Sequence, residues 1–167
     1  MRVYLPATIG MLRSLLTEGK VAAVSGTAFA VTPKLRESYA TGDTEELSYA
    51  AMADAAMASL RLVSADLEAD PRAPARRVVV CADVPDPRLR PDLDDGAVTL
   101  PGPVTMDAVA AVYVDLAEAE EAVRTAADVV DAADLGDADA EFTVGEAEDH
   151  ELAWYAPQEV SFLLELL

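Results

Sequence analysis

VVVCA at residues 78–82 and VAAVYV at residues 109–114 are the two stretches of sequence that decide the fold. The first is apolar without interruption, which is typical of a strand buried on both faces of a sheet. The residues between them are rich in Pro and Asp and show no helical pattern. Two strands in succession with no helix between them argue against a doubly wound parallel sheet, and they favour an α+β fold with an antiparallel sheet.

Further strands and helices are predicted on both sides of these two stretches. Strands are expected at 2–5 and 152–155, which Pro6 and Pro157 would end, and a short edge strand is expected at 97–100. Helical spacing and start signals predict helices at about 9–18, 33–39, 43–67, 116–135 and 160–167. Asp115, with Glu118 three residues later, is predicted to cap the fourth helix. Residues 137–151 are predicted to be mostly an acidic loop.

The resulting order is strand, helices, strand, strand, helix, strand. This is the order of a ferredoxin-like split β-α-β unit with an elaborated first crossover, and it predicts helices on one face of an antiparallel sheet. Residues 70–74 contain two prolines and read as an exposed loop, because neither side alone would hold a complete core. We therefore expect a single domain over residues 1–167, with an acidic segment at 115–151.

Cysteine usage and hydropathy predict a cytoplasmic protein without a membrane span. Cys81 is the one cysteine of the chain, which excludes an intramolecular disulfide and fits a reducing compartment. It lies within a predicted buried strand, so we expect an unreactive thiol. Charged residues interrupt every apolar stretch that could serve as an export signal, and no window approaches the roughly 18 apolar residues of a membrane span.

Acidic residues are concentrated in the last third of the chain. Residues 104–167 carry 17 Asp and Glu against one basic residue, Arg124, and therefore hold −16 of the net charge of −19. Such an excess is self-repelling, and it suggests a basic protein partner. There are two alternatives. In the first, the acidic residues form a solvated surface, with their number raised by GC-rich codon usage. In the second, they form a divalent cation site. Direct nucleic-acid binding is not expected, because phosphates require clustered Lys and Arg.

His150 is the one histidine, and it is the sharpest candidate for local chemistry. It lies between Asp149 and Glu151 and shortly before Trp154 and Tyr155, so these residues could form a ligand or interaction site. A structural role, a ligand or catalytic role and an interface role all remain open for it. The chain lacks the glycine-rich nucleotide-binding motifs, a nucleophile elbow and paired cysteines, so we assign no catalytic residue, cofactor or metal ligand.

Three strings of sequence suggest a family: YLPAT at 4–8, SGTAFAVTP at 25–33 and EDHELAWYAPQE at 148–159. Over nearly its full length the chain resembles an uncharacterised family of short acidic actinobacterial proteins. The resemblance implies a source. It implies no activity, cofactor or partner.

Our leading hypothesis is an interaction or regulatory module that presents its acidic C-terminal third to a basic protein. The candidate interaction residues are Glu118, Glu121, Asp149, His150, Glu151, Trp154 and Tyr155. The apolar helix expected at 160–167 suggests self-association as a homo-oligomer. The rival hypothesis is a small enzyme or divalent-metal-binding protein with a site around His150.

Overall fold

The computed structural model describes residues 1–39 and 41–167. Within them the strands are β1 (Arg2–Ala7), β2 (Lys20–Val21), β3 (Thr27–Phe29), β4 (Val78–Asp83), β5 (Arg88–Leu89), β6 (Ala97–Thr99), β7 (Val104–Thr105), β8 (Val109–Val114) and β9 (Ala153–Tyr155). The α-helices are α1 (Ile9–Glu18), α2 (Pro33–Ser38), α3 (Thr44–Ala69), α4 (Glu120–Asp134), α5 (Ala138–Glu148) and α6 (Val160–Glu165). Short 3-10 turns occur at Val24–Gly26, Met106–Ala108, Ala117–Ala119 and Pro157–Glu159. Among these residues, no helix combines the length and the apolar character needed to cross a membrane.

The main sheet has the strand order β5-β6-β3-β1-β4-β8-β9, and every neighbouring pair is antiparallel. β2 and β7 form a separate antiparallel pair. β4 is an inner strand of this sheet, next to the central strand β1, and its Cys81 lies opposite Tyr4 of β1 on one side and Ala111 of β8 on the other. The predicted α+β class and antiparallel sheet are confirmed, and β4 occupies the interior position that its apolar run predicted.

The ferredoxin-like order is not found. A split β-α-β unit needs a strand between the two that the first crossover connects, whereas β4 pairs directly with β1 over six residues. β6, which was predicted to be an edge strand, lies between β3 and β5. β5 was missed because its two residues lie in a Pro- and Asp-rich stretch that reads as a loop.

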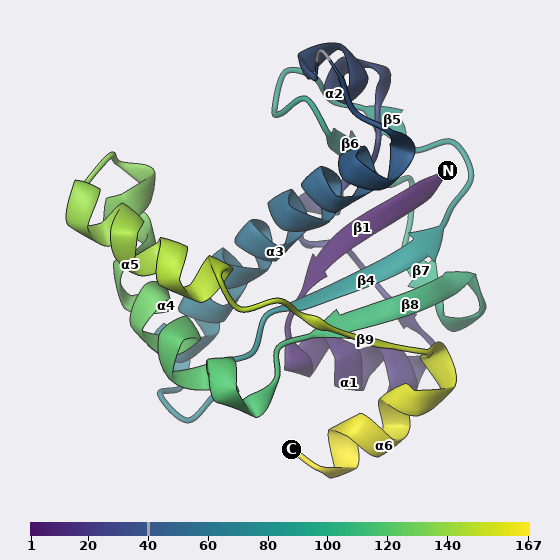
Figure 1. The fold of residues 1–167 in the computed structure, drawn as a ribbon. Helices are drawn as coiled ribbons and strands as arrows, with labels where there is room; N and C mark the ends of the chain where they lie inside the picture. Colours follow the sequence, from purple (N-terminus) through teal and green to yellow (C-terminus); the bar gives the residue numbers. More distant parts are fainter. Residues whose placement is uncertain (40) are drawn as a thin grey trace.

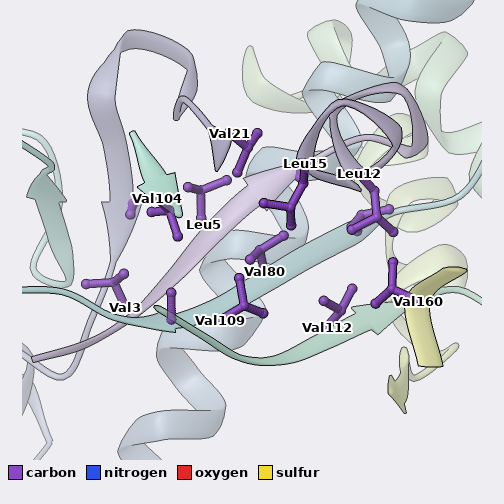
Figure 2. Packing of buried hydrophobic residues seen from close by; sticks show 14 of the residues in the cluster. Val3, Leu5, Leu12, Leu15, Val21, Val80, Val104, Val109, Val112 and Val160 are labelled. Atoms are coloured by element: carbon purple, nitrogen blue, oxygen red, sulfur yellow. The ribbon is translucent and has the colours of Figure 1, made fainter. Parts of the chain in front are cut away.

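One face of the sheet packs against α1 and α6 (Figure 1). The alternating residues Val3, Leu5, Val80 and Val112 point to this side, where they meet the buried face of both helices (Figure 2). Val78 belongs to the same buried cluster. The buried residues of these helices are Ile9, Leu12, Leu15, Val160, Leu163 and Leu164. Thr8 caps α1 by accepting from the N–H of Met11, and Gly19 ends it at φ 76°, which gives the helix the bounds predicted at about 9–18.

The opposite face packs against α3, so the helices cover both faces of the sheet rather than the one face predicted (Figure 1). Tyr4, Val79 and Cys81 point to this side and contact buried residues of α3, among them Leu47, Ala51 and Ala55. The physical reason lies in β4. A strand that is apolar at every position needs a cover on each face.

α4 packs beside the C-terminal half of α3, and α5 packs antiparallel on α4, farther from the sheet (Figure 1). The predicted loop at 137–151 is wrong, because α5 spans most of it. Asp137 caps this helix by accepting from the N–H of Ala140. Ala140, Val144 and Ala147 form its buried stripe, which is short and built of small residues among many acids, so the sequence pattern is weak.

Candidate functional site

A pocket of about 390 Å³ lies between α3, β8 and the connection from α5 to β9. Its polar lining consists of Arg77, Glu148, His150 and Glu151, and its aromatic lining of Tyr49 and Tyr113. The rest of the lining is apolar and comes from Met52, Ala53, Ala56, Met57 and Leu152. An apolar concave site with a few convergent polar groups is the usual form of a small-molecule site.

Arg77, which lines this pocket, forms a buried ion pair with Asp115. Their side chains are 3% and 0% exposed, and both the Nε and the Nη2 of Arg77 lie 2.8 Å from a carboxylate oxygen of Asp115. The backbone N–H of Arg77 also donates to this carboxylate, at 2.8 Å. The pair ties the residue before β4 to the residue after β8, and bidentate geometry makes such a contact specific as well as strong.

The prediction that Asp115 caps the following helix is wrong. The turn that follows, Ala117–Ala119, and α4 begin without a side-chain cap, because the carboxylate of Asp115 is engaged with Arg77 instead. Glu118 lies in that turn as an exposed residue. A buried guanidinium left without a counter-charge would be far more costly than an uncapped helix end.

Arg77 also connects the ion pair to the connection between α5 and β9. Its Nη2 donates to the carbonyl oxygen of His150 at 2.8 Å. In the described part of the chain Nη1 has no hydrogen-bond partner, and no fully buried side-chain nitrogen or oxygen lacks one. Nη1 is therefore not fully buried, and Arg77 is one of the residues that line the pocket.

The two tyrosines contribute aromatic surface from different elements. Tyr113 lies on β8, opposite Trp154 of β9, and is half-buried. Burial raises the pKa of the Tyr113 phenol, so this hydroxyl stays protonated as a hydrogen-bonding group. Tyr49 lies on α3 and is 64% exposed at the outer side of the pocket.

The structure separates the residues that the sequence grouped together. His150 and Glu151 line the pocket, and Trp154 lies beside the pocket residue Tyr113 as an exposed side chain. Tyr155 points to the other face of the sheet and packs on the core beneath α1 and α6. Asp149 ends α5 as an exposed residue, and Glu118 and Glu121 lie exposed at the start of α4 without lining the pocket.

Over residues 1–39 and 41–167, no group of three or more His, Cys, Asp or Glu side chains is arranged to hold a metal ion. Cys81 is buried, and burial raises the pKa of its thiol, which disfavours the reactive thiolate. The pocket offers hydrogen-bonding groups, the carboxylates of Glu148 and Glu151, the imidazole of His150, and aromatic and apolar contact.

Asp54 of α3 is a second titratable group with an unusual environment. Burial and the neighbouring charges of Asp94 and Asp95 raise its pKa from 3.8 to about 6. Asp95 is itself held by hydrogen bonds from Ser38 to its carboxylate and from Thr32 to its carbonyl oxygen. None of these residues lines the pocket around His150.

Sequence analysis missed Arg77, Tyr113 and the α3 side of the pocket. One signal was present: Arg77 directly precedes one buried strand and Asp115 directly follows the next. Opposite charges at the ends of two successive antiparallel strands are expected to meet, since the C-terminal end of one strand lies beside the N-terminal end of the other. The contribution of α3 has no such signal, because it depends on how that helix crosses the sheet.

Comparison with known proteins places the chain in a family. The model of a family described as "Family of unknown function (DUF6912)" matches residues 1–164, nearly the whole chain, and the chain belongs to this family. This confirms the resemblance to an uncharacterised family. The actinobacterial source stays a prediction. The searches of curated proteins and of solved structures gave no significant match.

Proposed function

We propose that this member of the DUF6912 family is an interaction module that binds a basic protein through the outer surface of α5. The observation that carries the proposal is Phe142, an aromatic side chain that is 72% exposed in the middle of that helix. Large aromatic residues are enriched at the centres of protein interfaces.

Phe142 is flanked by carboxylates on its own side of the helix. Asp139 precedes it by three residues and Glu146 follows it by four, and such spacings place side chains on one face. In the described part of the chain neither carboxylate has an ion-pair partner. An apolar anchor between two acidic groups is complementary to a partner that carries Lys or Arg around an apolar pocket.

The position of α5 leaves this surface open. The helix packs mainly on α4, through Ala140, Val144 and Ala147, and lies far from the sheet (Figure 1). Other acids of the segment are already engaged: Arg61 pairs with Asp134 and Arg76 with Glu120. The remaining excess of negative charge also speeds the approach of a basic partner and opposes binding of nucleic-acid phosphates.

Self-association through α6 is part of the same proposal. Phe162 and Leu166 are 69% and 85% exposed on this helix, opposite the residues that it buries against the sheet. The single buried thiol is compatible with work in a reducing cytoplasm. Sedimentation velocity measures the oligomeric state of the wild type and of the variant Phe162→Ser/Leu166→Ser. The proposal predicts a dimer for the wild type and a monomer for the variant.

Affinity capture with matched charge variants tests partner binding. Native lysate is passed over three tagged proteins: the wild type, the variant Asp139→Asn/Glu146→Gln and the control Asp66→Asn/Glu45→Gln. Each is washed at about 0.1 M and at about 1 M salt. The electrostatic screening length falls from about 10 Å to about 3 Å between these two concentrations, which weakens contacts between charges. Asp66 and Glu45 are exposed acids of α3. The proposal predicts one stoichiometric basic protein that the wild type and the control retain at low salt only.

Three results would contradict the proposal. These are an empty capture at both salts, a partner that the α5 variant retains as well as the wild type does, and a partner that Phe142→Ser binds equally well. Because Phe142 is exposed, its replacement by Ser is not expected to affect folding. Weaker binding by this variant therefore reports on the interface itself.

A small enzyme or divalent-metal protein with its site around His150 is the second candidate. It is favoured by the pocket that His150 and Glu151 line. A thermal-shift series with divalent cations tests the metal form of this candidate, because a cation that binds the folded state raises the melting temperature. His150→Ala provides the control, since the shift must disappear in that variant.

A further inference from the structure

We propose that the pocket around Arg77 binds a small amphipathic amine that also carries a hydroxyl or carbonyl oxygen. The ammonium group lies at the mouth beside Glu148 and Glu151, the apolar body lies on Met52, Met57 and Leu152, and the oxygen accepts from Nη1 of Arg77. This site is separate from the outer surface of α5 and does not depend on the binding of a basic protein.

The charges around the pocket select a cation. Arg77 is the one basic side chain in the lining apart from His150, and its charge is compensated by the bidentate contact with Asp115. Glu148 and Glu151 are exposed at the mouth and carry negative charge. The net charge of −19 adds a negative field over the whole molecule. An anionic ligand would meet repulsion here, whereas an ammonium group would be attracted.

Aromatic and apolar side chains select an organic cation rather than a metal ion. Tyr49 and Tyr113 supply ring surface, and the face of a tyrosine ring attracts an ammonium group. Met52, Met57 and Leu152 supply an apolar wall, and thioether side chains adapt to ligands of varied shape. In the part of the chain that the structure describes, no three or more His, Cys, Asp or Glu side chains are grouped so that they could hold a metal ion.

Arg77 adds a requirement for a hydrogen-bond acceptor at the inner end. Arg77 lines the pocket with a side chain that is only 3% exposed, and its Nη1, which is not fully buried, has no protein acceptor among the described residues. Because Nη1 is not fully buried, it is open to water in the free protein, and a ligand that displaces this water must supply an acceptor to retain the hydrogen bond. A neutral oxygen suffices, because Asp115 already balances the guanidinium charge.

The five methionines allow a direct test by NMR of the full chain with ¹³C-labelled methionine methyl groups. Met52 and Met57 line the pocket, whereas Met1, Met11 and Met106 do not and serve as internal controls. The probes are tyramine, phenethylamine and 4-hydroxyphenylacetate, which share an aromatic body. Tyramine is expected to shift both pocket methyl signals, phenethylamine to bind about fivefold more weakly for lack of the hydroxyl, and 4-hydroxyphenylacetate to cause no shift.

Substitutions at the mouth separate the site from unspecific binding. Glu148→Gln/Glu151→Gln is expected to lower tyramine affinity about threefold to tenfold, whereas Glu141→Gln, an exposed position of α5 outside the lining, is expected to leave it unchanged. Ala53→Phe, at an exposed lining position of α3, is expected to fill the pocket and abolish the shifts. The folding of each variant is checked by its melting temperature.

The proposal is overturned if tyramine leaves Met52 and Met57 unshifted, if all five methyl signals shift alike, or if 4-hydroxyphenylacetate binds as well as tyramine. It is also overturned if Glu141→Gln weakens binding as much as the substitutions at the mouth do. These outcomes are independent of the capture experiment, because Phe142 does not line the pocket in which the three probes are tested.

Discussion

Arg77 and Asp115 hold each other through both the side chain and the backbone. Besides the two 2.8 Å contacts between guanidinium and carboxylate, the N–H of Arg77 donates to the carboxylate, and the N–H of Asp115 donates to the carbonyl oxygen of Arg77 at 3.1 Å. The pair fixes the entry of β4 to the exit of β8. It also positions His150 through the bond from Arg77 to the carbonyl oxygen of that residue.

Breaking this buried pair should destabilise the fold strongly. Asp115→Ala leaves the guanidinium buried without its counter-charge, so we expect a loss of about 3–5 kcal/mol in the free energy of unfolding. Asp83→Ala removes the partner of Arg2 from an ion pair whose side chains are 55% and 58% exposed, and should cost less than about 1 kcal/mol. Urea denaturation at neutral pH measures both. Equal losses in the free energy of unfolding would show that the buried pair contributes no more to stability than the exposed pair does.

Ser59 should be required at the junction of α3 with the sheet. Its buried hydroxyl donates to the carbonyl oxygen of Ala7 at 2.7 Å and accepts from the N–H of Val78 at 2.9 Å. Ser59→Ala removes both bonds in a site closed to water, and we expect a loss of about 2 kcal/mol or more. The control Ser64→Ala removes a single bond, to the carbonyl oxygen of Ala127, from a part-buried position. The backbone N–H of Val78 should exchange faster in Ser59→Ala but not in Ser64→Ala, which would locate the destabilisation at this junction.

Two glycines of α1 should respond to alanine with opposite signs. Gly19 ends the helix at φ 76°, so Gly19→Ala strains the backbone although the space around it is open, and we expect a loss of about 1 kcal/mol. Gly10 lies inside the helix with ordinary room for a methyl group, so Gly10→Ala should stabilise by about 0.5–1 kcal/mol. Thermal unfolding of the two variants side by side gives the comparison. A gain from Gly19→Ala would contradict the left-handed cap.

Stability should fall as the pH rises through the titration of Asp54. Its pKa is raised to about 6 in the folded state from an ordinary 3.8, so between about pH 4 and pH 6 the folded state binds more protons than the unfolded state. Asp54→Asn removes this penalty and should be more stable than the wild type by roughly 1 kcal/mol at pH 7.5, after allowance for partial exposure, and by less at pH 5. Urea denaturation at both pH values measures the difference. A constant difference would rule out this titration, and Asp66→Asn on the same helix controls for lost charge.

Local signals predicted several elements with accurate bounds. Thr8 and Gly19 bracket α1 because each acts on the backbone within a few residues, the first by accepting an N–H and the second by adopting a positive φ. The strands at 78–82 and 109–114 were equally accessible, since a run of β-branched and small apolar residues is recorded directly in the sequence. These signals do not depend on distant parts of the chain.

The candidate sites were only partly predictable. His150 was found because it is the sole histidine, and the acidic segment was found by counting charge. The helix α5 was missed because its buried stripe consists mostly of alanine, and with it the exposed position of Phe142. Trp154 and Tyr155 were grouped with His150, but alternation along a strand sends adjacent residues to opposite faces.

The sequence by itself determined the α+β class, the antiparallel character of the sheet and the concentration of acid in the last third of the chain. Each of these follows from residue type, periodicity or charge within a short window. Only the tertiary structure decided the strand order, the covering of both faces, and the meeting of Arg77, Tyr113 and His150 around one pocket. Those features depend on contacts between residues far apart in the chain, and their stabilisation comes from burial and ion pairing that exist only once the elements have packed.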